Sequence, residues 1–530
     1  MRHLETRAAA LLAALMLAWS AVGVRGQAPA AQPFDILIRG GRVLDGSGNP
    51  WVRADVGVRG GRIVAVGRLD GAAATRTIDA RDRYVTPGFI DVHSHAGEGL
   101  AEGLNHAQPV LAQGITTVVV NPDGGGPVDV AAQRARYESR GIGVNAGLFV
   151  PHGSIRRQVL GMEDRAPTPA ELEKMVALVR AGMKAGAVGL SSGLYYAPGS
   201  YARTEEVIAM ARAAGEYGGV YSSHIRDEGD YSVGVVAAVD EVIRIAEEAR
   251  LPGIVSHMKA LGHASWGLSL ASLMRIDAAR ARGVEVWADQ YPYEASGTSI
   301  TGALVPRWAQ VGGDDALRKR ATGAERGRLR DEIRANIARR GGAASLQISR
   351  FAPDPSLEGK TLADLAQATG ESPEEVALDL LARGGASLVS FNMNERDIEQ
   401  IMTRPYTMTC TDGDLVPMGE GKPHPRAYGA FPRKLRVYVR ERQVVDWPFA
   451  IRSMTHLPAA VFGLEDRGQL RPGAWADILI FDPARVTDKA TYTDPHQLSE
   501  GIDTILVNGV LVRDEGTFTG ALPGKVVARR

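Results

Sequence analysis

The 530-residue sequence predicts an α/β fold: a (β/α)8 TIM barrel joined to a small β-domain. Three observations support this fold class. Short apolar segments alternate with amphipathic helical segments through the middle of the chain. Short strand-like segments with glycine turns occur near both ends. Polar residues gather where the predicted strands end, as in barrel enzymes. A doubly wound open sheet is the alternative for the middle of the chain.

The first 26 residues have the features of a secretory signal peptide. Arg2 and Arg7 form a basic segment before an apolar stretch from Ala8 to Val24, and Val24-Arg25-Gly26 offers a cleavage site. We therefore predict export to a bacterial periplasm or to the outside, with no stable membrane association after cleavage. An uncleaved anchor is the alternative, although the apolar run is short for a membrane span.

Residues 34–86 and 456–530 are expected to form one β-domain. FDILIRGGRVLDGSG and ADVGVRGGRIVAVG each contain a strand, a Gly-Gly turn and a second strand. ADILIFDPARV and IDTILVNGVLVRDEG repeat this pattern near the other end of the chain. Isolated hairpins are only marginally stable, so we expect both ends to share one sheet.

Residues 87–455 are expected to form the barrel. The candidate strands are GFIDVHSH, GITTVVV, GVNAGLFV, GAVGLSSG, GGVYSSH, PGIVSH, GVEVWADQ and YTMTCTD. Helix-like runs such as AELEKMVALVRAGMKAG separate them, which is the alternation typical of parallel strands with crossover helices. The connection between strands 7 and 8 is too long for a structureless loop. It contains several helical patterns, so we predict a helical insertion at about residues 300–400.

The composition excludes several classes of protein. The chain has 61 basic and 61 acidic side chains, and this neutrality argues against a nucleic-acid partner, which requires a basic face. With 45% hydrophobic and 23% charged residues, it is neither disordered nor a multi-span membrane protein. Cys410 is the single cysteine, so an intrachain disulfide and a multi-thiol zinc site are both impossible.

Histidine and aspartate residues lie at the carboxyl ends of five of the predicted strands. They are His93, His95, Asp123, His224, His257 and Asp412. The carboxyl ends of barrel strands meet on one face, and alternate residues of a strand point the same way. Both imidazoles of His93-Ser94-His95 can therefore reach one cation. Imidazole and carboxylate ligands suit one or two zinc ions, with other divalent metals as alternatives.

Several motifs resemble the amidohydrolase superfamily, and within it the D-aminoacylase (N-acyl-D-amino-acid deacylase) family. VTPGFIDVHSH resembles the segment that leads into the barrel of that superfamily. The closer resemblance is carried by GAVGLSSGLYYAPGSYA, GGVYSSHIRDEG, IVSHMKALG, DQYPYEASGT, CTDGD and HPRAYGAFPRKL. Together with LRPGAWADILIFDP, these motifs extend the resemblance over nearly the whole mature chain.

The resemblance implies roles for individual residues. His93 and His95 match ligands of a first metal site, His224 and His257 match ligands of a second, and Asp412 matches the catalytic aspartate. The positions that hold the substrate carboxylate are matched by Lys259, Tyr291, Ser296 and Arg426.

One turn departs from the family pattern. Where the family has Gly-Asn-Cys-Gly, this chain has Asn121-Pro122-Asp123-Gly124, which puts Asp123 at the place of a zinc-binding thiolate. A carboxylate can also bridge two cations, but oxygen is a harder ligand than sulfur, so the preference for zinc is expected to loosen. The alternative is that Asp123 only supports the turn.

These observations predict an enzyme that hydrolyses N-acyl-D-amino acids to a carboxylate and a free D-amino acid. In this hypothesis a metal-bound hydroxide is the nucleophile, and Asp412 acts first as general base and then as general acid. A dipeptidase or another amidase acting on D-containing or unusual amides is the alternative enzyme. The remaining alternatives are a non-catalytic metal-binding relative and a thiol hydrolase built on Cys410.

Overall fold

The computed structural model describes residues 32–529, so the predicted signal peptide lies outside the described residues. Eight parallel strands in the middle of the chain pair in the order β16-β12-β11-β10-β9-β8-β7-β6. They are β6 (Phe89–Asp91), β7 (Ile115–Val120), β8 (Asn145–Pro151), β9 (Gly189–Gly193), β10 (Val220–His224), β11 (Gly253–Val255), β12 (Val286–Gln290) and β16 (Thr407–Thr409). The barrel predicted from the sequence is confirmed, with its strands at the eight predicted segments.

The barrel closes through residues that follow its first and last strands. The amide of Asp412 donates to the carbonyl oxygen of His93 at 2.9 Å, and the amide of His95 donates to the carbonyl oxygen of Gly413 at 3.0 Å. His95 and Asp414 also pair as a parallel bridge. Closure therefore brings the polar ends of the first and eighth strands side by side.

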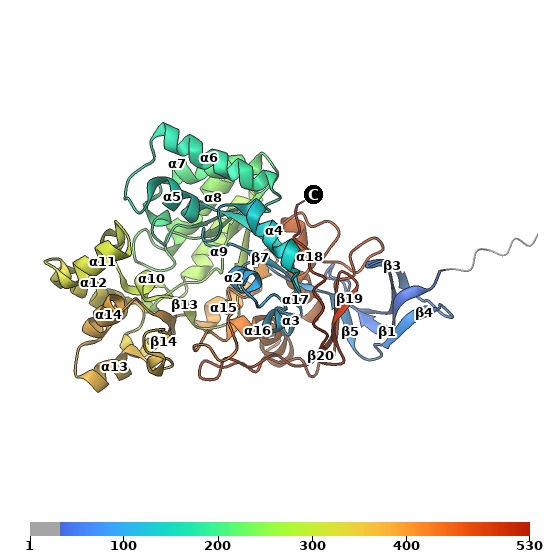
Figure 1. Cartoon of the computed structure of the whole chain (residues 1–530). Coiled ribbons are helices and arrows are strands. Elements are labelled where there is room, and N and C mark those ends of the chain that lie inside the picture. The colour runs from blue at the N-terminus through green and yellow to red at the C-terminus, as the bar shows by residue number, and fades with distance from the viewer. Residues whose placement is uncertain (1–31, 530) are drawn as a thin grey trace, which may run out of the picture.

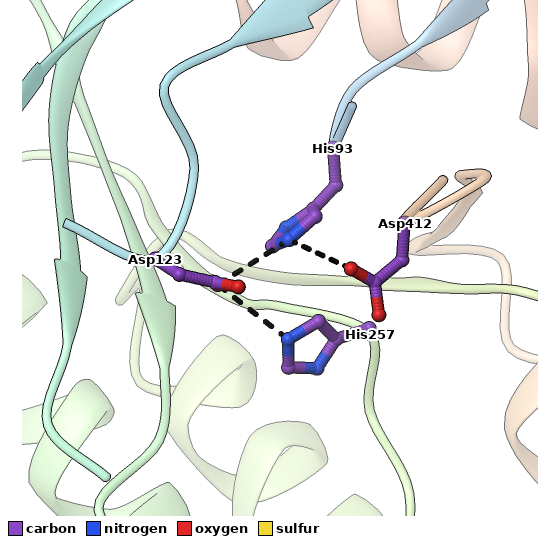
Figure 2. Close-up of side chains that lie close together, drawn as sticks. All are labelled: His93, Asp123, His257 and Asp412. Atoms are coloured by element: carbon purple, nitrogen blue, oxygen red, sulfur yellow. Dashed lines mark ion pairs between the residues drawn. The ribbon is translucent and has the colours of Figure 1, made fainter. Parts of the chain in front are cut away.

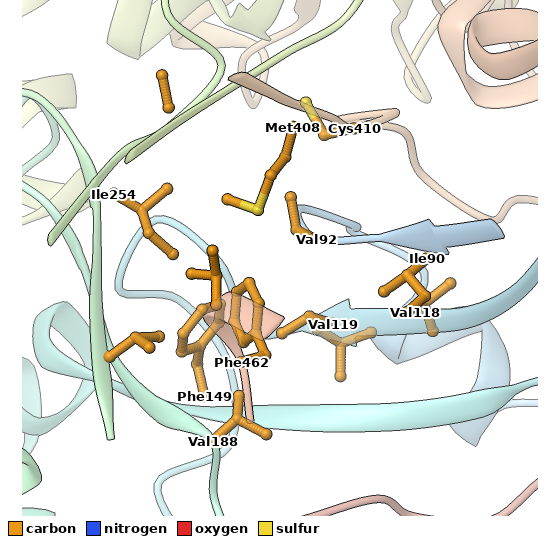
Figure 3. Close-up of a cluster of buried hydrophobic side chains, with 14 of the residues drawn as sticks. Ile90, Val92, Val118, Val119, Phe149, Val188, Ile254, Met408, Cys410 and Phe462 are labelled. Atoms are coloured by element: carbon orange, nitrogen blue, oxygen red, sulfur yellow. The ribbon is translucent and has the colours of Figure 1, made fainter. Parts of the chain in front are cut away.

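The strands are buried on both faces, as expected where helices cover a parallel sheet. Every residue of β7, with the sequence ITTVVV, is buried. Figure 3 shows part of the resulting core, in which Val118 lies beside Ile90, and Val119 lies toward Phe149 and Phe462. Such an apolar interior fixes the strands, and the strands fix the side chains at their ends.

Helices surround the barrel strands, most of them on the outside of the barrel (Figure 1). They are α2 (Gly97–Ala101), α3 (Gln108–Leu111), α4 (Val130–Arg140), α5 (His152–Leu160), α6 (Pro169–Lys184), α7 (Thr204–Gly215), α8 (Val235–Ala249), α9 (Leu268–Ala281), α15 (Glu395–Met402), α16 (Arg426–Arg433), α17 (Trp447–Met454) and α18 (His456–Val461). Helix α6 begins with a capping box, in which Thr168 and Glu171 satisfy each other's backbone amides. Over residues 32–529, no helix has both the length and the apolar character needed to cross a membrane.

The two ends of the chain share one sheet of nine strands, as predicted. Its strands are β1 (Phe34–Val43), β2 (Val52–Arg59), β3 (Arg62–Gly67), β4 (Ala74–Asp79), β5 (Tyr84–Pro87), β17 (Ile478–Phe481), β18 (Ile502–Val507), β19 (Val510–Asp514) and β20 (Thr517–Phe518). The antiparallel pairing of β5 with β17 joins the N-terminal and C-terminal halves. Figure 1 shows this sheet beside the barrel, on the side away from the insertion.

The predicted insertion between strands 7 and 8 is present and has its own apolar core. Its helices are α10 (Ile300–Leu304), α11 (Asp314–Thr322), α12 (Arg326–Arg339), α13 (Leu362–Thr369) and α14 (Pro373–Ala382). The structure adds a three-stranded antiparallel sheet of β13 (Ser296–Ser299), β14 (Leu346–Arg350) and β15 (Ser387–Ser390), which the sequence analysis did not identify. The small polar residues of β13 carry no strand-like apolar pattern, which explains the omission.

A buried lysine, Lys434, links the eighth barrel strand to helix α17 through hydrogen bonds. Lys434 opens the π-helix η6 (Lys434–Glu441), and its Nζ donates to Thr409 Oγ1 and Ser453 Oγ, both at 2.8 Å. Burial lowers the pKa of Lys434 from 10.5 to about 7. The ammonium form is the one that burial disfavours.

The unfolding free energy is therefore expected to rise with pH between about 7 and 10.5 through Lys434. In this window the unfolded chain binds a proton at Lys434 that the folded chain does not bind, so raising the pH favours the folded state. Lys434→Met should remove this component, which costs about 4 kcal/mol at pH 7. Loss of the two hydrogen bonds of Lys434 offsets about 2 kcal/mol of this, so the variant should be more stable at pH 7 by about 2 kcal/mol. The measurement is the unfolding free energy of the wild type and of Lys434→Met, determined by denaturant unfolding at pH 7 and pH 9.5. An equal change of this free energy with pH in the two proteins would contradict the prediction.

Candidate metal centre

The predicted site residues surround a cavity of about 1370 Å³ at the carboxyl ends of the barrel strands. All of them line it except His93, which is fully buried beneath its floor. The insertion also contributes to the wall, through Ser296, Leu388 and other residues of its sheet. The structure therefore brings together side chains that are far apart in the sequence.

Four of these residues form a compact cluster, shown in Figure 2. His93 Nε2 lies 3.3 Å from Asp123 Oδ1 and 3.5 Å from Asp412 Oδ1. His257 Nε2 lies 3.5 Å from Asp123 Oδ1. One ligand atom from each of the four residues lies within 4.8 Å of all the others. This spacing allows one cation to contact all four side chains.

His95 and His224 extend the cluster on either side. His95 Nε2 lies 3.4 Å from Asp123 Oδ2 and 3.2 Å from Asp412 Oδ1. His224 Nδ1 lies 3.8 Å from Asp123 Oδ1. Asp123 thus faces histidines from both predicted ligand pairs, which is the arrangement required of a bridging carboxylate.

The donor atoms of this cluster fit a divalent cation. Both ring nitrogens of His93 and Oδ1 of Asp123 are buried and have no hydrogen-bond partner among the described residues. Buried polar atoms are almost always satisfied, because leaving one unpaired is costly. A cation held between the imidazole nitrogens and carboxylate oxygens would satisfy them. Nitrogen and oxygen donors of these types suit zinc.

The electrostatics keep the carboxylates ionised. Burial alone would raise the pKa of Asp123 and Asp412, but electrostatic and hydrogen-bond interactions with neighbouring groups outweigh it and hold both pKa values well below the usual range. For Asp123 those groups are histidines, His93 foremost, and for Asp412 the largest contribution comes from Arg426. Both side chains therefore offer negative oxygens at neutral pH.

The imidazoles differ in protonation. Burial lowers the pKa of His224 to about 4, so its ring is neutral at physiological pH. For His257, burial and Lys259 are outweighed by Asp412, Glu228 and Asp123, which raise its pKa to about 10. A cation must displace the proton of His257 in order to bind its ring, so metal binding is expected to release protons.

The Asn121-Pro122-Asp123-Gly124 turn is held without help from the Asp123 carboxylate. Asn121 and Asp123 have φ values of 62° and 55°, in the left-handed region. Asn121 Nδ2 donates to Gln133 Oε1 at 2.8 Å, and Ser191 Oγ donates to the Asn121 carbonyl oxygen at 2.6 Å. These contacts fix the strained turn and leave the carboxylate to face the histidines. Strain of this kind is commonly concentrated at functional sites.

Glu228 is a member of the site that the sequence analysis missed. It follows β10 within the SHIRDEG segment and lies close to His224 and His257, with which it forms a second group of metal-ligand type. Lys259 Nζ lies 2.5 Å from Glu228 Oε1 and 2.6 Å from His257 Nδ1. Lys259 thus places its Nζ where a cation would otherwise contact this group, so the cluster around Asp123 is the better cation site; two of its three N–H donors are used there and one remains for a ligand.

The residues predicted to hold a substrate carboxylate also line the cavity. Arg426 Nη1 lies 2.7 Å from Asp412 Oδ2, but the two atoms are not aligned as a hydrogen bond. The ring of Tyr291 lies near both cations, with its centroid 4.7 Å from the Arg426 guanidinium carbon and 5.6 Å from Lys259 Nζ. Ser296 Oγ donates to Asn392 Oδ1 at 3.1 Å.

Cys410 takes no part in this site. Its side chain is fully buried in the barrel core next to Met408 and does not line the cavity (Figure 3). Burial, followed by the nearby carboxylates of Asp289 and Asp91, raises the pKa of the thiol well above its usual value. A nucleophilic cysteine needs an accessible thiolate, so the chain is unsuited to thiol catalysis at this position.

Comparison with known proteins places most of the chain in one family. Residues 76–513 match a model described as "Amidohydrolase family". The chain is 36% identical to a D-aminoacylase of Alcaligenes xylosoxydans xylosoxydans, over 94% of this chain and 98% of that protein. It is also 36% identical to an N-acyl-D-glutamate deacylase of the same organism, over 94% and 97% of the two chains.

A solved structure shows the same relationship in three dimensions. It is an N-acyl-D-glutamate deacylase from Bordetella bronchiseptica, complexed with zinc and a phosphonate inhibitor that mimics the tetrahedral intermediate of the reaction. The two proteins are 35% identical and superimpose with a TM-score of 0.81, covering 94% of this chain and 100% of the other.

Proposed function

Since this chain belongs to the amidohydrolase family and is a D-aminoacylase-like hydrolase, we propose that it releases free D-amino acids from N-acyl-D-amino acids. The observation that carries the proposal is one cavity that combines an imidazole–carboxylate cluster with Lys259 and Arg426. The cluster supplies hydrolytic chemistry, and the two cations suit the carboxylate of an amino acid. The relatives named for this activity match nearly the whole length of the chain.

The cluster is proposed to hold zinc, through His93, His95, Asp123, His224, His257 and Asp412. When bound, a divalent cation supplies the Lewis acidity that activates water and polarises an amide carbonyl. The zinc in the deacylase from Bordetella bronchiseptica supports this choice of metal. The buried, unpaired donor atoms of His93 and Asp123 support its position in this chain.

Asp412 is proposed to move the proton. Its carboxylate is ionised and lies at the end of the eighth strand, facing the cavity. It can accept a proton from the attacking water and deliver it to the leaving amine nitrogen as the C–N bond breaks. Arg426 Nη1, 2.7 Å from Asp412 Oδ2, stabilises the ionised carboxylate. The backbone hydrogen bond from Asp412 to His93 fixes the position of the Asp412 main chain.

Lys259 and Arg426 are proposed to bind the α-carboxylate of the substrate. The N–H groups on Arg426 Nη1 make no aligned hydrogen bond among the described residues, so they can serve a ligand. A guanidinium can bind a carboxylate through two parallel hydrogen bonds, whereas an ammonium acts as a point charge. The Tyr291 ring lies within 5.6 Å of both cations and lines the same cavity, so the carboxylate would bind beside it.

The test is hydrolysis of a panel of substrates by the purified, metal-analysed enzyme. N-acetyl-D-amino acids are expected to be cleaved at least about 100-fold faster than their L-enantiomers, since a chiral site that grips both the carboxylate and the amide misplaces the wrong enantiomer. Dipeptides with a D-residue form the comparison set. Faster cleavage of those dipeptides would favour a dipeptidase, and cleavage of none of the N-acyl-D-amino acids would exclude the proposed function.

A further inference from the structure

A buried arginine in the wall of the catalytic cavity has no acidic partner. Arg340 follows helix α12 of the insertion, and only 2% of its surface is exposed. It lines the same cavity as the metal cluster. Among residues 32–529, no Asp or Glu carboxylate lies within ion-pair distance of its guanidinium.

All the hydrogen bonds of Arg340 go to neutral groups. Its Nε donates to the carbonyl oxygen of Ala303 at 3.1 Å, its Nη1 to Ser390 Oγ at 3.2 Å and its Nη2 to Tyr195 OH at 3.2 Å. A guanidinium has five N–H donors, so two remain for a further acceptor. One belongs to each Nη atom, and a guanidinium can bind a carboxylate through N–H groups of both.

Three of the four other buried arginines among the described residues have carboxylate partners. Arg156 pairs with Glu206, and Arg467 pairs with Asp477. Burying a charge without a partner of opposite charge is costly. The absence of such a partner beside Arg340 in the described part of the chain therefore suggests that a ligand supplies it. Arg307 adds to the local positive charge, because its guanidinium carbon lies 5.8 Å from the centroid of the Tyr195 ring.

Arg340 lies close to the reacting centre. The ring of Tyr195 separates it from the metal cluster: its centroid is 5.4 Å from that of His224, and its hydroxyl contacts Arg340. The guanidinium is thus about one tyrosine side chain away from the cluster. A group attached to the substrate near the scissile amide could span this distance.

We propose that Arg340 binds a second carboxylate of the substrate, so that the enzyme prefers N-acyl-D-amino acids that carry an additional acidic group. This inference rests on the proposed deacylase function and defines its substrate class. The second carboxylate could come from the side chain of the amino acid, as in N-acetyl-D-glutamate, or from the acyl group, as in N-succinyl-D-leucine. Both present the same chemistry to the guanidinium.

The experiment compares kcat/KM within two matched pairs of substrates. N-acetyl-D-glutamate against N-acetyl-D-glutamine tests a side-chain carboxylate, because the two differ only by an amide in place of the acid. N-succinyl-D-leucine against N-acetyl-D-leucine tests an acyl carboxylate. The acidic member of one pair is expected to be preferred about 100-fold, since a site built around a charged hydrogen bond rejects an analogue that lacks it.

Arg340→Met should reduce that ratio about 100-fold, and Arg340→Lys, which keeps the charge, should retain most of it. The matched control is Arg350→Met: Arg350 also lines the cavity, but it is exposed and already paired with Glu420. This control should leave the ratio unchanged.

Two outcomes would overturn the inference while leaving the proposed function intact. One is a wild-type ratio near one in both pairs, with the D-substrates still hydrolysed; this result needs no variant. The other is an equal loss by Arg340→Met on acidic and neutral substrates, which would assign Arg340 a purely structural role. Failure to hydrolyse any N-acyl-D-amino acid would instead overturn the proposed function.

Discussion

Replacing Asp412 by asparagine is expected to lower kcat about 1000-fold while leaving the metal bound. The amide has the size of the carboxylate and keeps one oxygen, but it cannot accept a proton, and general acid–base catalysis contributes about 100- to 10,000-fold. The Asp412 side chain is buried and already ionised, so the loss arises from proton transfer and not from a changed shape. Steady-state kinetics together with metal analysis of the same preparation measure both effects.

The matched control is Asp414→Asn, the same chemical change two residues further on. Asp414 is exposed at the cavity rim and lies outside the metal cluster, so its variant should retain at least about half of the wild-type kcat, as surface substitutions usually do. Near-normal turnover by Asp412→Asn would remove it from the proposed mechanism. An equal loss in both variants would point to a general effect of charge on this loop.

Much of the fold was predictable because strong local patterns agreed with the topology. Each barrel strand is a short buried apolar run, and each is followed by polar residues at the face where barrel sites form. A shared β-domain could be predicted because isolated hairpins at either end of the chain would be only marginally stable. The pairing of β5 with β17 joins the two ends in one sheet. His93, His95, His224 and His257 were identifiable from position alone, since each follows a predicted strand.

Other features depend on contacts that no local pattern encodes. Glu228 joins the site only because the segments after β10 and β11 approach each other and bring it to Lys259. The strand β13 consists of Ser296, Gly297, Thr298 and Ser299, and it pairs with a segment ninety residues away. Arg340 reaches the cavity from the insertion, and its missing partner can be recognised only once the packing is known.

The single cysteine illustrates how the structure refines a sequence argument. Strand alternation allowed Cys410 and Asp412 to share one face, but Asp412 has a φ of 50°, which ends the regular extended backbone. Cys410 therefore packs in the core, whereas Asp412 faces the cluster (Figures 2 and 3). The described donors around the cluster are nitrogen and oxygen, and Asp123, which the resemblance puts at the place of a thiolate, is one of them.

Asp123→Ala is accordingly expected to weaken metal binding by at least about 100-fold and to abolish most turnover, because removing one partner of a buried charged cluster costs several kcal/mol. The Asp123 Oδ1 atom lies 3.3, 3.5 and 3.8 Å from nitrogens of His93, His257 and His224, so its loss leaves three imidazoles without a shared anion. Equilibrium dialysis against zinc, with folding monitored by circular dichroism, measures the affinity.

Asp123→Cys provides the matched comparison, since it restores a negative ligand at the same place but makes it soft. Thiolate favours zinc over harder ions such as Mn²⁺, whereas carboxylate serves both. We expect the Cys variant to bind zinc at least as tightly as the wild type and to lose affinity for Mn²⁺ about 10-fold, because thiolate is a poor ligand for that ion. If Asp123→Ala instead retains the zinc content of the wild type, Asp123 is not a metal ligand and only supports the turn. The contacts of Asn121 and Ser191 show that this turn can be held without the carboxylate, so that result would be interpretable.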